Sequence, residues 1–202
     1  MNNINYQKEL DKLIDNISRE HTTPKLMLHA CCAPCSSYCL VYLSEYFDIT
    51  VLFYNPNINT ETEYKKRAKE LKRLITGMEF RNKVDYANLD YNPDEFYGAV
   101  RGLEECAEGR ERCFECYRLR LAKTAAYAVK KDYDYFCTTL SISPLKNAAK
   151  INEIGSILSE QYGVKWLPSD FKKKNGYKTS VELSQKYNLY RQNYCGCVFS
   201  MR

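Results

Sequence analysis

Four cysteines fall within residues 31–39, directly after the apolar residues 26–28. The motif reads His-Ala-Cys-Cys-Ala-Pro-Cys from His29 to Cys35, and Cys39 completes the group. A short apolar run followed by a helical pattern predicts a buried strand that turns into a helix, which is where open α/β sheets build their reactive sites. The other six cysteines are Cys106, Cys113, Cys116, Cys137, Cys195 and Cys197. Ten thiols grouped in this way indicate metal or redox chemistry.

Cys113 and Cys116 lie three residues apart at the start of a predicted helix. Residues at this spacing share a helix face, so both sulfur atoms can reach one metal centre. The same spacing also fits a thioredoxin-like redox pair, or two small buried side chains. The helix geometry leaves these three interpretations open.

Cys31, Cys32 and Cys35 can converge on one point if the backbone rotates at the end of the strand. Soft thiolates suit zinc or iron, and four of them complete either an all-cysteine zinc site or a [4Fe-4S] cluster. The spacing matches neither a ferredoxin nor a zinc-ribbon pattern, so it does not decide between the metals. Cys39 and Cys137 lie in apolar segments and fit small core residues.

Two further features bear on redox and proton chemistry. Cys195 and Cys197 are separated by one glycine, a spacing that can close a strained, easily reduced disulfide; the alternative is a pair of inert surface thiols. His29 is the only histidine near the first cysteine group, and it is either a proton donor or a hydrogen-bonded residue at a strand end. The chain has no glycine-rich phosphate-binding loop, so nucleotide-dependent chemistry has no support.

The composition is that of a mildly basic globular protein. The 202 residues carry a formal charge of +5 and 18 tyrosines, which permits a polyanionic partner such as RNA. The first residues show no secretory signal, and no apolar stretch approaches the roughly 20 residues that cross a bilayer. We therefore expect a cytoplasmic protein without a membrane partner, whose reduced cysteines serve metal or catalytic roles.

Strand and helix patterns alternate along the chain. Strands are predicted at residues 25–30, 48–54, 84–89, 133–138 and 164–167. Helices are predicted at residues 4–18, 36–47 with Ser36 as N-cap, 60–75, 93–103, 113–130, 147–162 and 181–186. This order predicts a three-layer α/β/α fold with a mainly parallel sheet. Without a linker or repeat, we expect a single α/β domain over residues 1–202, in which residues 1–20 form an added N-terminal helix.

Five motifs together resemble the cobalamin-independent epoxyqueuosine reductases, the QueH family. They are His29-x-Cys31-Cys32-Ala33-Pro34-Cys35-Ser36, Tyr54-Asn55-Pro56-Asn57-Ile58 with Glu63-Tyr64-x-x-Arg67, Glu111-Arg112-Cys113-x-x-Cys116-Tyr117-Arg118-Leu119-Arg120-Leu121, Thr138-Thr139-Leu140-Ser141-Ile142-Ser143-Pro144, and Tyr190-Arg191-Gln192-x-Tyr194-Cys195-Gly196-Cys197-x-x-Ser200. They follow the order of the family, so residues 24–202 resemble its catalytic domain.

The resemblance implies an oxidoreductase on an α/β fold related to the adenine nucleotide hydrolase-like (HUP) group. It implies two-electron reduction of the epoxide of epoxyqueuosine to queuosine, the last step of queuosine biosynthesis. The modified base would stand at the wobble position, in the anticodon loop of the tRNAs for aspartate, asparagine, histidine and tyrosine. The resemblance also implies a [4Fe-4S] cluster with an additional iron ion beside it.

Motif matching assigns the metal ligands residue by residue. Cys31, Cys32, Cys113 and Cys116 match the cluster ligands of the family. Some members have Asp where this chain has Cys35, and both side chains can bind a metal, so Cys35 is the candidate ligand of the additional iron.

We assign candidate catalytic roles to four residues. Cys195 and Cys197 would pass on reducing equivalents from an unidentified electron donor by cycling between dithiol and disulfide. His29 or Tyr194 would supply a proton. The rival hypotheses are a metal-free thiol-disulfide oxidoreductase and a zinc-stabilised RNA-binding domain.

Basic residues in two segments are candidates for contacting tRNA. The Lys- and Arg-rich residues 65–73 are expected to form a solvated helix face, and the loop 172–178 with Tyr177 is the stronger candidate. Arg118, Arg120 and Arg191 lie close to cysteines in the sequence and are instead candidates for lining the site.

Overall fold

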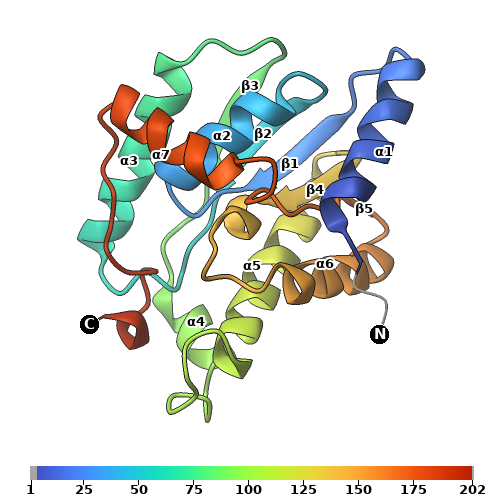
Figure 1. The fold of residues 1–202 in the computed structure, drawn as a ribbon. Helices are drawn as coiled ribbons and strands as arrows, with labels where there is room; N and C mark the ends of the chain where they lie inside the picture. The colour runs from blue at the N-terminus through green and yellow to red at the C-terminus, as the bar shows by residue number, and fades with distance from the viewer. Residues whose placement is uncertain (1–3, 202) are drawn as a thin grey trace.

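A sheet of five parallel strands runs through the middle of the molecule (Figure 1). The computed structural model describes residues 4–201. The strands are β1 (Lys25–His29), β2 (Asp48–Phe53), β3 (Val84–Asn88), β4 (Tyr135–Thr138) and β5 (Lys165–Trp166), in the spatial order β3-β2-β1-β4-β5. β1 and β2 are almost continuously buried, as expected of parallel strands with both faces covered.

Helices cover both faces of the sheet (Figure 1). α2 (Ala33–Leu43), α3 (Glu61–Gly77) and α7 (Gly176–Lys186) lie on one side, and α5 (Glu111–Lys130) and α6 (Ala148–Tyr162) lie on the other. The remaining helical elements are α1 (Tyr6–Arg19), α4 (Pro93–Ala99), and the 3₁₀ turns η1 (Thr139–Ile142) and η2 (Val198–Ser200). This arrangement confirms the predicted three-layer α/β/α fold with a parallel sheet. None of the helices in residues 4–201 has the length and apolar character needed to cross a bilayer.

The strand order creates a switch point between β1 and β4. The chain runs outward from β1 to β2 and β3, then returns to place β4 on the other side of β1. The connections that leave β1 and β4 therefore go to opposite faces of the sheet, which opens a crevice at the carboxyl ends of these two strands. Residues 30–35 and η1 both begin at this crevice.

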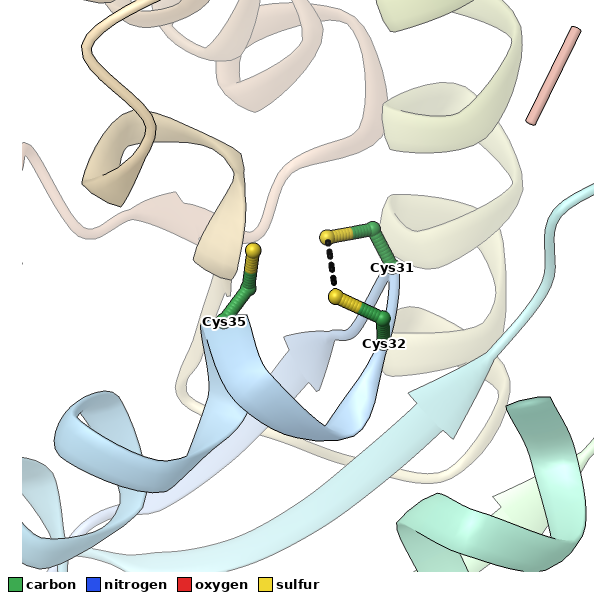
Figure 2. Close-up of side chains that lie close together, drawn as sticks. All are labelled: Cys31, Cys32 and Cys35. Atoms are coloured by element: carbon green, nitrogen blue, oxygen red, sulfur yellow. Dashed lines mark hydrogen bonds between the residues drawn. The ribbon is translucent and has the colours of Figure 1, made fainter. Parts of the chain in front are cut away.

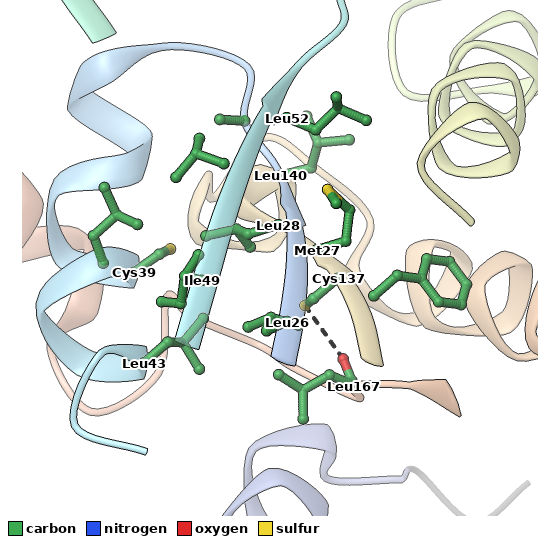
Figure 3. Close-up of a cluster of buried hydrophobic side chains, with 14 of the residues drawn as sticks. Leu26, Met27, Leu28, Cys39, Leu43, Ile49, Leu52, Cys137, Leu140 and Leu167 are labelled. Atoms are coloured by element: carbon green, nitrogen blue, oxygen red, sulfur yellow. Dashed lines mark hydrogen bonds between the residues drawn. The ribbon is translucent and has the colours of Figure 1, made fainter. Parts of the chain in front are cut away.

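The core lies on both faces of β1 (Figure 3). Leu26, Met27 and Leu28 are fully buried. Cys39 packs from α2 on one face, and Cys137 of β4 is buried with its Sγ 3.3 Å from the carbonyl oxygen of Leu167. The interpretation of Cys39 and Cys137 as core residues is confirmed.

Two helices begin three or more residues earlier than predicted. α2 begins at Ala33, not at Ser36, because Cys32 takes the extended N-cap conformation and Pro34 fits the first turn, where no backbone N–H is needed. Ser36 is therefore not the N-cap; its hydroxyl donates to the carbonyl oxygen of Cys32 (2.8 Å). α7 begins at Gly176, five residues before the predicted start, so the predicted loop 172–178 contributes the first turn of a helix.

We predict that Gly155→Ala destabilises the fold. A Cβ on Gly155 of α6 would lie 2.2 Å from the indole of Trp166 in β5, and that ring is held by a hydrogen bond from its Nε1 to Asn152 (3.0 Å). Overpacking of this kind costs about 1–3 kcal/mol. Urea unfolding measures the loss.

Gly98→Ala is the matched control for this change. Gly98 is also helical, but a Cβ there would have no atom within 4 Å, so the substitution should be neutral or gain up to about 1 kcal/mol. Equal unfolding midpoints for the two variants would contradict the packing argument.

Candidate active site

A pocket of about 320 Å³ lies at the switch point. Its walls come from three parts of the chain: the β1–α2 connection, the segment from η1 to Lys146, and the C-terminal segment 191–195, with further residues from α5 and α7. The chain thus brings the first and last cysteine motifs to one cavity. Cys31, Cys32, Cys35 and Cys195 all line it.

Three cysteines converge at the end of β1 (Figure 2). The sulfur atoms of Cys31, Cys32 and Cys35 all lie within 4.8 Å of one another, and those of Cys31 and Cys32 are 3.8 Å apart. The extended backbone of Cys32 turns directly into α2, which places Cys35 in the first helical turn opposite the other two. Thr139 at the start of η1 adds a hydroxyl 3.7 Å from the Cys31 sulfur.

One of these thiols is favoured as the thiolate. The pKa of Cys31 lies well below its ordinary range, because hydrogen bonds with the thiols of Cys32 and Cys35 favour its charged form. The same hydrogen bond to Cys31, together with burial, raises the pKa of Cys32 to about 12, and the pKa of Cys35 is raised for the same reasons. The triad therefore carries one negative charge easily and needs a cation to carry more.

The triad has the spacing of ligands on a single metal ion. Sulfur atoms bound tetrahedrally at 2.3 Å from zinc lie roughly 3.8 Å apart. Within residues 4–201, Cys31, Cys32 and Cys35 form the one group of three or more potential metal ligands whose donor atoms all lie within 4.8 Å of one another, and this group does not include Cys113 or Cys116.

Cys113 and Cys116 lie in the first two turns of α5 and are both buried. The backbone N–H of Gly109 donates to the sulfur of Cys113 (3.2 Å), and burial raises the pKa of Cys116 to about 12. Cys116 packs with Cys197 in a small apolar cluster. The pair is therefore buried outside the triad, and neither residue lines the pocket.

Arg120 is a fully buried cation that links the two cysteine groups. Its Nε donates to the carbonyl oxygen of Cys116 (3.1 Å), and its Nη1 lies 3.5 Å from the side-chain oxygen of Asn55. Its Nη2 has no partner within the described chain, and the side chain lines the pocket. The positive charge lies near the sulfurs of Cys31, Cys116 and Cys195.

The three arginines that were expected to line the site do not all do so. Arg120 and Arg191 line the pocket as predicted. Arg118 is instead exposed on α5 and pairs with Glu115, so the prediction for Arg118 is wrong.

Arg67 is a second buried cation, and it holds the C-terminal segment. Only 1% of its side chain is exposed; its Nε pairs with Glu63 (2.7 Å) and its Nη1 donates to the carbonyl oxygen of Cys195 (3.1 Å). The backbone N–H of Asn59 donates to the carbonyl oxygen of Gly196 (2.9 Å), and the hydroxyl of Tyr194 donates to the Asn59 side chain (2.8 Å). The Cys-Gly-Cys turn is therefore fixed against the connection between β2 and α3.

Two other basic residues of α3, Lys66 and Arg73, also hold the C-terminal segment in place. The ammonium of Lys66 lies 3.5 Å from the centre of the Tyr190 ring. Arg73 donates to the carbonyl oxygens of Tyr187 and Asn188, each at 3.1 Å. Residues that we expected on a solvated face thus bind the segment 187–196. Sequence reasoning missed this because the two partners lie more than 100 residues apart.

His29 is fully buried at the end of β1. Its Nδ1 lies 2.8 Å from the hydroxyl of Thr138 and its Nε2 lies 3.1 Å from the carbonyl oxygen of Tyr54. Burial, with the nearby Arg120 charge, lowers the pKa of His29 to about 3, so the ring is neutral at physiological pH. These contacts favour the interpretation of His29 as a hydrogen-bonded residue that ties β1 to its neighbours.

A parallel, doubly wound sheet with a thiol triad and buried cations at its switch point defines a thiol-dependent metal or redox protein. The family model described as "Epoxyqueuosine reductase QueH" matches residues 26–202. Three relatives named epoxyqueuosine reductase QueH are 44%, 45% and 38% identical. They come from Streptococcus pyogenes serotype M1 (98% of this chain, 79% of the relative), Staphylococcus epidermidis (98% and 84%) and Thermotoga maritima (87% and 90%). The chain belongs to the QueH family of epoxyqueuosine reductases, which confirms the predicted family and the enzyme class of oxidoreductase.

We predict that Gly196→Ala displaces the Cys-Gly-Cys turn. Gly196 has φ +122°, which disfavours any side chain, and a Cβ would lie 3.1 Å from Ile58 and 3.2 Å from Arg67. The hydrogen bond from the Asn59 amide should weaken, and hydrogen exchange at that amide should accelerate by about tenfold. Gly102→Ala is the control, since Gly102 also has a positive φ (+80°) but no atom within 4 Å. Unchanged protection of Asn59 in Gly196→Ala would show that the turn is not held by these contacts.

Proposed function

We propose that the chain reduces the epoxide of epoxyqueuosine in tRNA, giving queuosine and water. The observation that carries this proposal is the pocket in which the triad of Cys31, Cys32 and Cys35 meets the C-terminal Cys195, in a chain whose family match spans residues 26–202. The proposed substrates are the tRNAs for aspartate, asparagine, histidine and tyrosine, modified at the wobble base.

The donor set fits iron bound by thiolates. We propose that Cys31, Cys32, Cys113 and Cys116 hold a [4Fe-4S] cluster and that Cys35 binds an additional iron ion. Soft thiolates are the preferred ligands of such centres, and all five cysteines are buried or half-buried. Cys31, Cys32 and Cys35 line the cavity, and Arg120, which also lines it, lies near both Cys31 and Cys116. The unpartnered Nη2 of the buried Arg120 supports this proposal, because that guanidinium needs a negative group in the pocket. When bound, an iron-sulfur centre with an adjacent iron supplies single electrons and a Lewis acid for an oxygen atom.

The residues of the chain would bind and orient the substrate. A cavity of about 320 Å³ is at the small end of ligand pockets, so it admits the modified base but not the folded RNA. A base that is extruded from the anticodon loop can enter such a pocket, and aromatic rings at the entrance can stack on its neighbours. Tyr177, 41% exposed, lines the pocket and is our candidate for stacking on a base. Leu145, 73% exposed, also lines the pocket and is our candidate for an apolar contact with a base.

Two of the lysines in residues 172–178 form ion pairs within the protein. Lys174 pairs with Asp11 of α1 (2.7 Å), and Lys172 pairs with Asp170 (2.5 Å). Lys173 is exposed close to Tyr177, and Arg191 is exposed at the pocket. We propose Lys173 and Arg191 as the phosphate contacts of this region.

The C-terminal dithiol can supply both electrons and protons of the reaction. When Cys195 and Cys197 form a disulfide, two S–H bonds are lost and two electrons and two protons are released. Removal of the epoxide oxygen consumes the same number: two C–O bonds break, a C=C bond forms and the oxygen leaves as water. An external thiol or other two-electron donor then reduces the disulfide.

Of the two predicted proton donors, Tyr194 lines the pocket and His29 does not, so we propose Tyr194 as the proton donor.

Metal content tests the cluster assignment. Anaerobically purified protein should be brown and contain more than about four irons per chain. Cys31→Ser and Cys113→Ser should lose most of the iron and all conversion of epoxyqueuosine in tRNA, with dithionite as electron source. Cys39→Ala, a thiol lost from the core, should keep both. Colourless protein with one zinc per chain would instead support the zinc-stabilised RNA-binding domain, which the close spacing of the triad also fits.

The dithiol step is tested separately. The double variant Cys195→Ser/Cys197→Ser should keep its iron and should still convert some epoxyqueuosine with dithionite, because that reductant delivers electrons directly. With a dithiol reductant, its turnover should fall by about a hundredfold or more, because the relay is lost. Normal turnover with both reductants would refute the relay.

A further inference from the structure

Lys146 is a buried ammonium that donates a hydrogen bond to a cysteine sulfur. Its Nζ lies 3.1 Å from the sulfur of Cys195, and only 8% of its side chain is exposed. Its other charged partner is Glu108, farther away at 3.6 Å and with 32% of its side chain exposed. A buried ammonium is stable only beside a negative group or an acceptor. The sulfur of Cys195 is the nearer of the two groups that can meet this need.

The two thiols of the Cys-Gly-Cys turn have different surroundings. Cys195 lines the pocket, whereas Cys197 is 8% exposed and packs against Phe96, Val100 and Cys116. The backbone carbonyl of Cys195 accepts a hydrogen bond from Arg67, and the side chain of Cys195 faces Lys146. The two thiols therefore differ: Cys195 faces the pocket and a buried ammonium, whereas Cys197 faces apolar side chains and Cys116.

We propose that Lys146 is the positioning residue that holds Cys195 as the thiolate of the Cys195/Cys197 pair, leaving Cys197 as the neutral second thiol. This inference rests on the proposed dithiol step, and it states which of the two thiols is ionised before the disulfide forms. The Cys195 thiolate is the electron-rich sulfur that faces the pocket. Formation of the S–S bond releases one proton, from Cys197, while the ammonium keeps its own proton. Cys195 gave its proton to solvent when it ionised, so the second proton of the departing water is taken from solvent. The two electrons go to the epoxide.

The other charged and titratable groups around Lys146 and Cys195 come from α5 and from the connection that precedes it. Glu108 in the α4–α5 connection faces Lys146, and the phenol of Tyr117 on α5 lies near it. Arg120 and Cys116 on α5 lie near Cys195. Burial pulls the pKa of Lys146 down, but the adjacent Cys195 and Tyr117 outweigh it, and the pKa ends above its ordinary value. Lys146 thus remains charged whenever Cys195 is a thiolate.

The test measures alkylation of Cys195 against pH in anaerobic, iron-loaded protein. The background is Cys197→Ser, so that Cys195 is the thiol read out in the tryptic peptide 192–202. Lys146→Met should raise the midpoint by about one unit or more and slow alkylation at pH 7 about tenfold, because the opposite charge is lost. Lys146→Arg should restore most of the effect.

The control is Lys150→Met, because Lys150 pairs with Glu153 (2.6 Å) instead of a cysteine, and its midpoint should be unchanged. Circular dichroism and iron content check that each variant is folded, and Lys146→Gln replaces Lys146→Met if the latter does not fold. An unchanged midpoint in a folded Lys146→Met or Lys146→Gln protein overturns the proposal.

A second readout keeps this inference apart from the proposed function. In protein with both cysteines, loss of Lys146 should make the reduction potential of the pair more negative, by about 30 mV for a tenfold loss of thiolate stabilisation. If alkylation and potential both shift but the wild-type protein does not convert epoxyqueuosine, the proposed substrate is wrong and the role of Lys146 stands. If epoxyqueuosine is converted but neither property responds to Lys146, the role of Lys146 is wrong.

Discussion

The site depends on the burial of positive charge beside sulfur. Arg67 and Arg120 are each 1% exposed, and 8% of the Lys146 side chain is exposed. Three cations removed from water in one region would destabilise the fold unless negative or accepting groups met them. Carbonyl oxygens, Glu63, Glu108 and thiols provide these partners, but Nη2 of both arginines has none within the described chain. The region is therefore arranged to receive more negative charge than its own acidic side chains supply.

Each of these cations also fixes backbone or side chains, which explains how distant segments form one site. Arg67 reaches from α3 to the carbonyl of Cys195, and Arg120 closes on the carbonyl of Cys116 one turn before it on α5. Lys146 follows η1, which itself begins at the switch point. The C-terminal segment adds no strand to the sheet and gains its position from these contacts and from α3. Cys195 therefore comes to the pocket through charge and hydrogen bonds, whereas Cys197 packs in the apolar cluster with Cys116.

The periodic elements were predictable from the sequence because both faces of β1 and β2 are buried and helices such as α1 bury one apolar face. The start of α2 was not predictable in this way. Ser36 is a good N-cap residue by type, but the N-cap is Cys32, whose extended conformation is set by the strand before it. Cys31, Cys32 and Cys35 were identifiable from spacing alone. Arg67 and Lys146 were not identified as neighbours of Cys195, since a contact across 128 or 49 residues leaves no local pattern.

The ten thiols differ in surroundings more than in spacing. Cys39 and Cys137 are fully buried against apolar side chains, and burial is the main reason that the pKa of each is raised. Cys31 has the opposite shift because two thiols and a threonine hydroxyl surround its sulfur. Cys35 in this position keeps the triad all sulfur, whereas a carboxylate there would add a harder ligand. An all-sulfur triad favours a soft metal, and the buried cations nearby offset the charge that three thiolates would bring together.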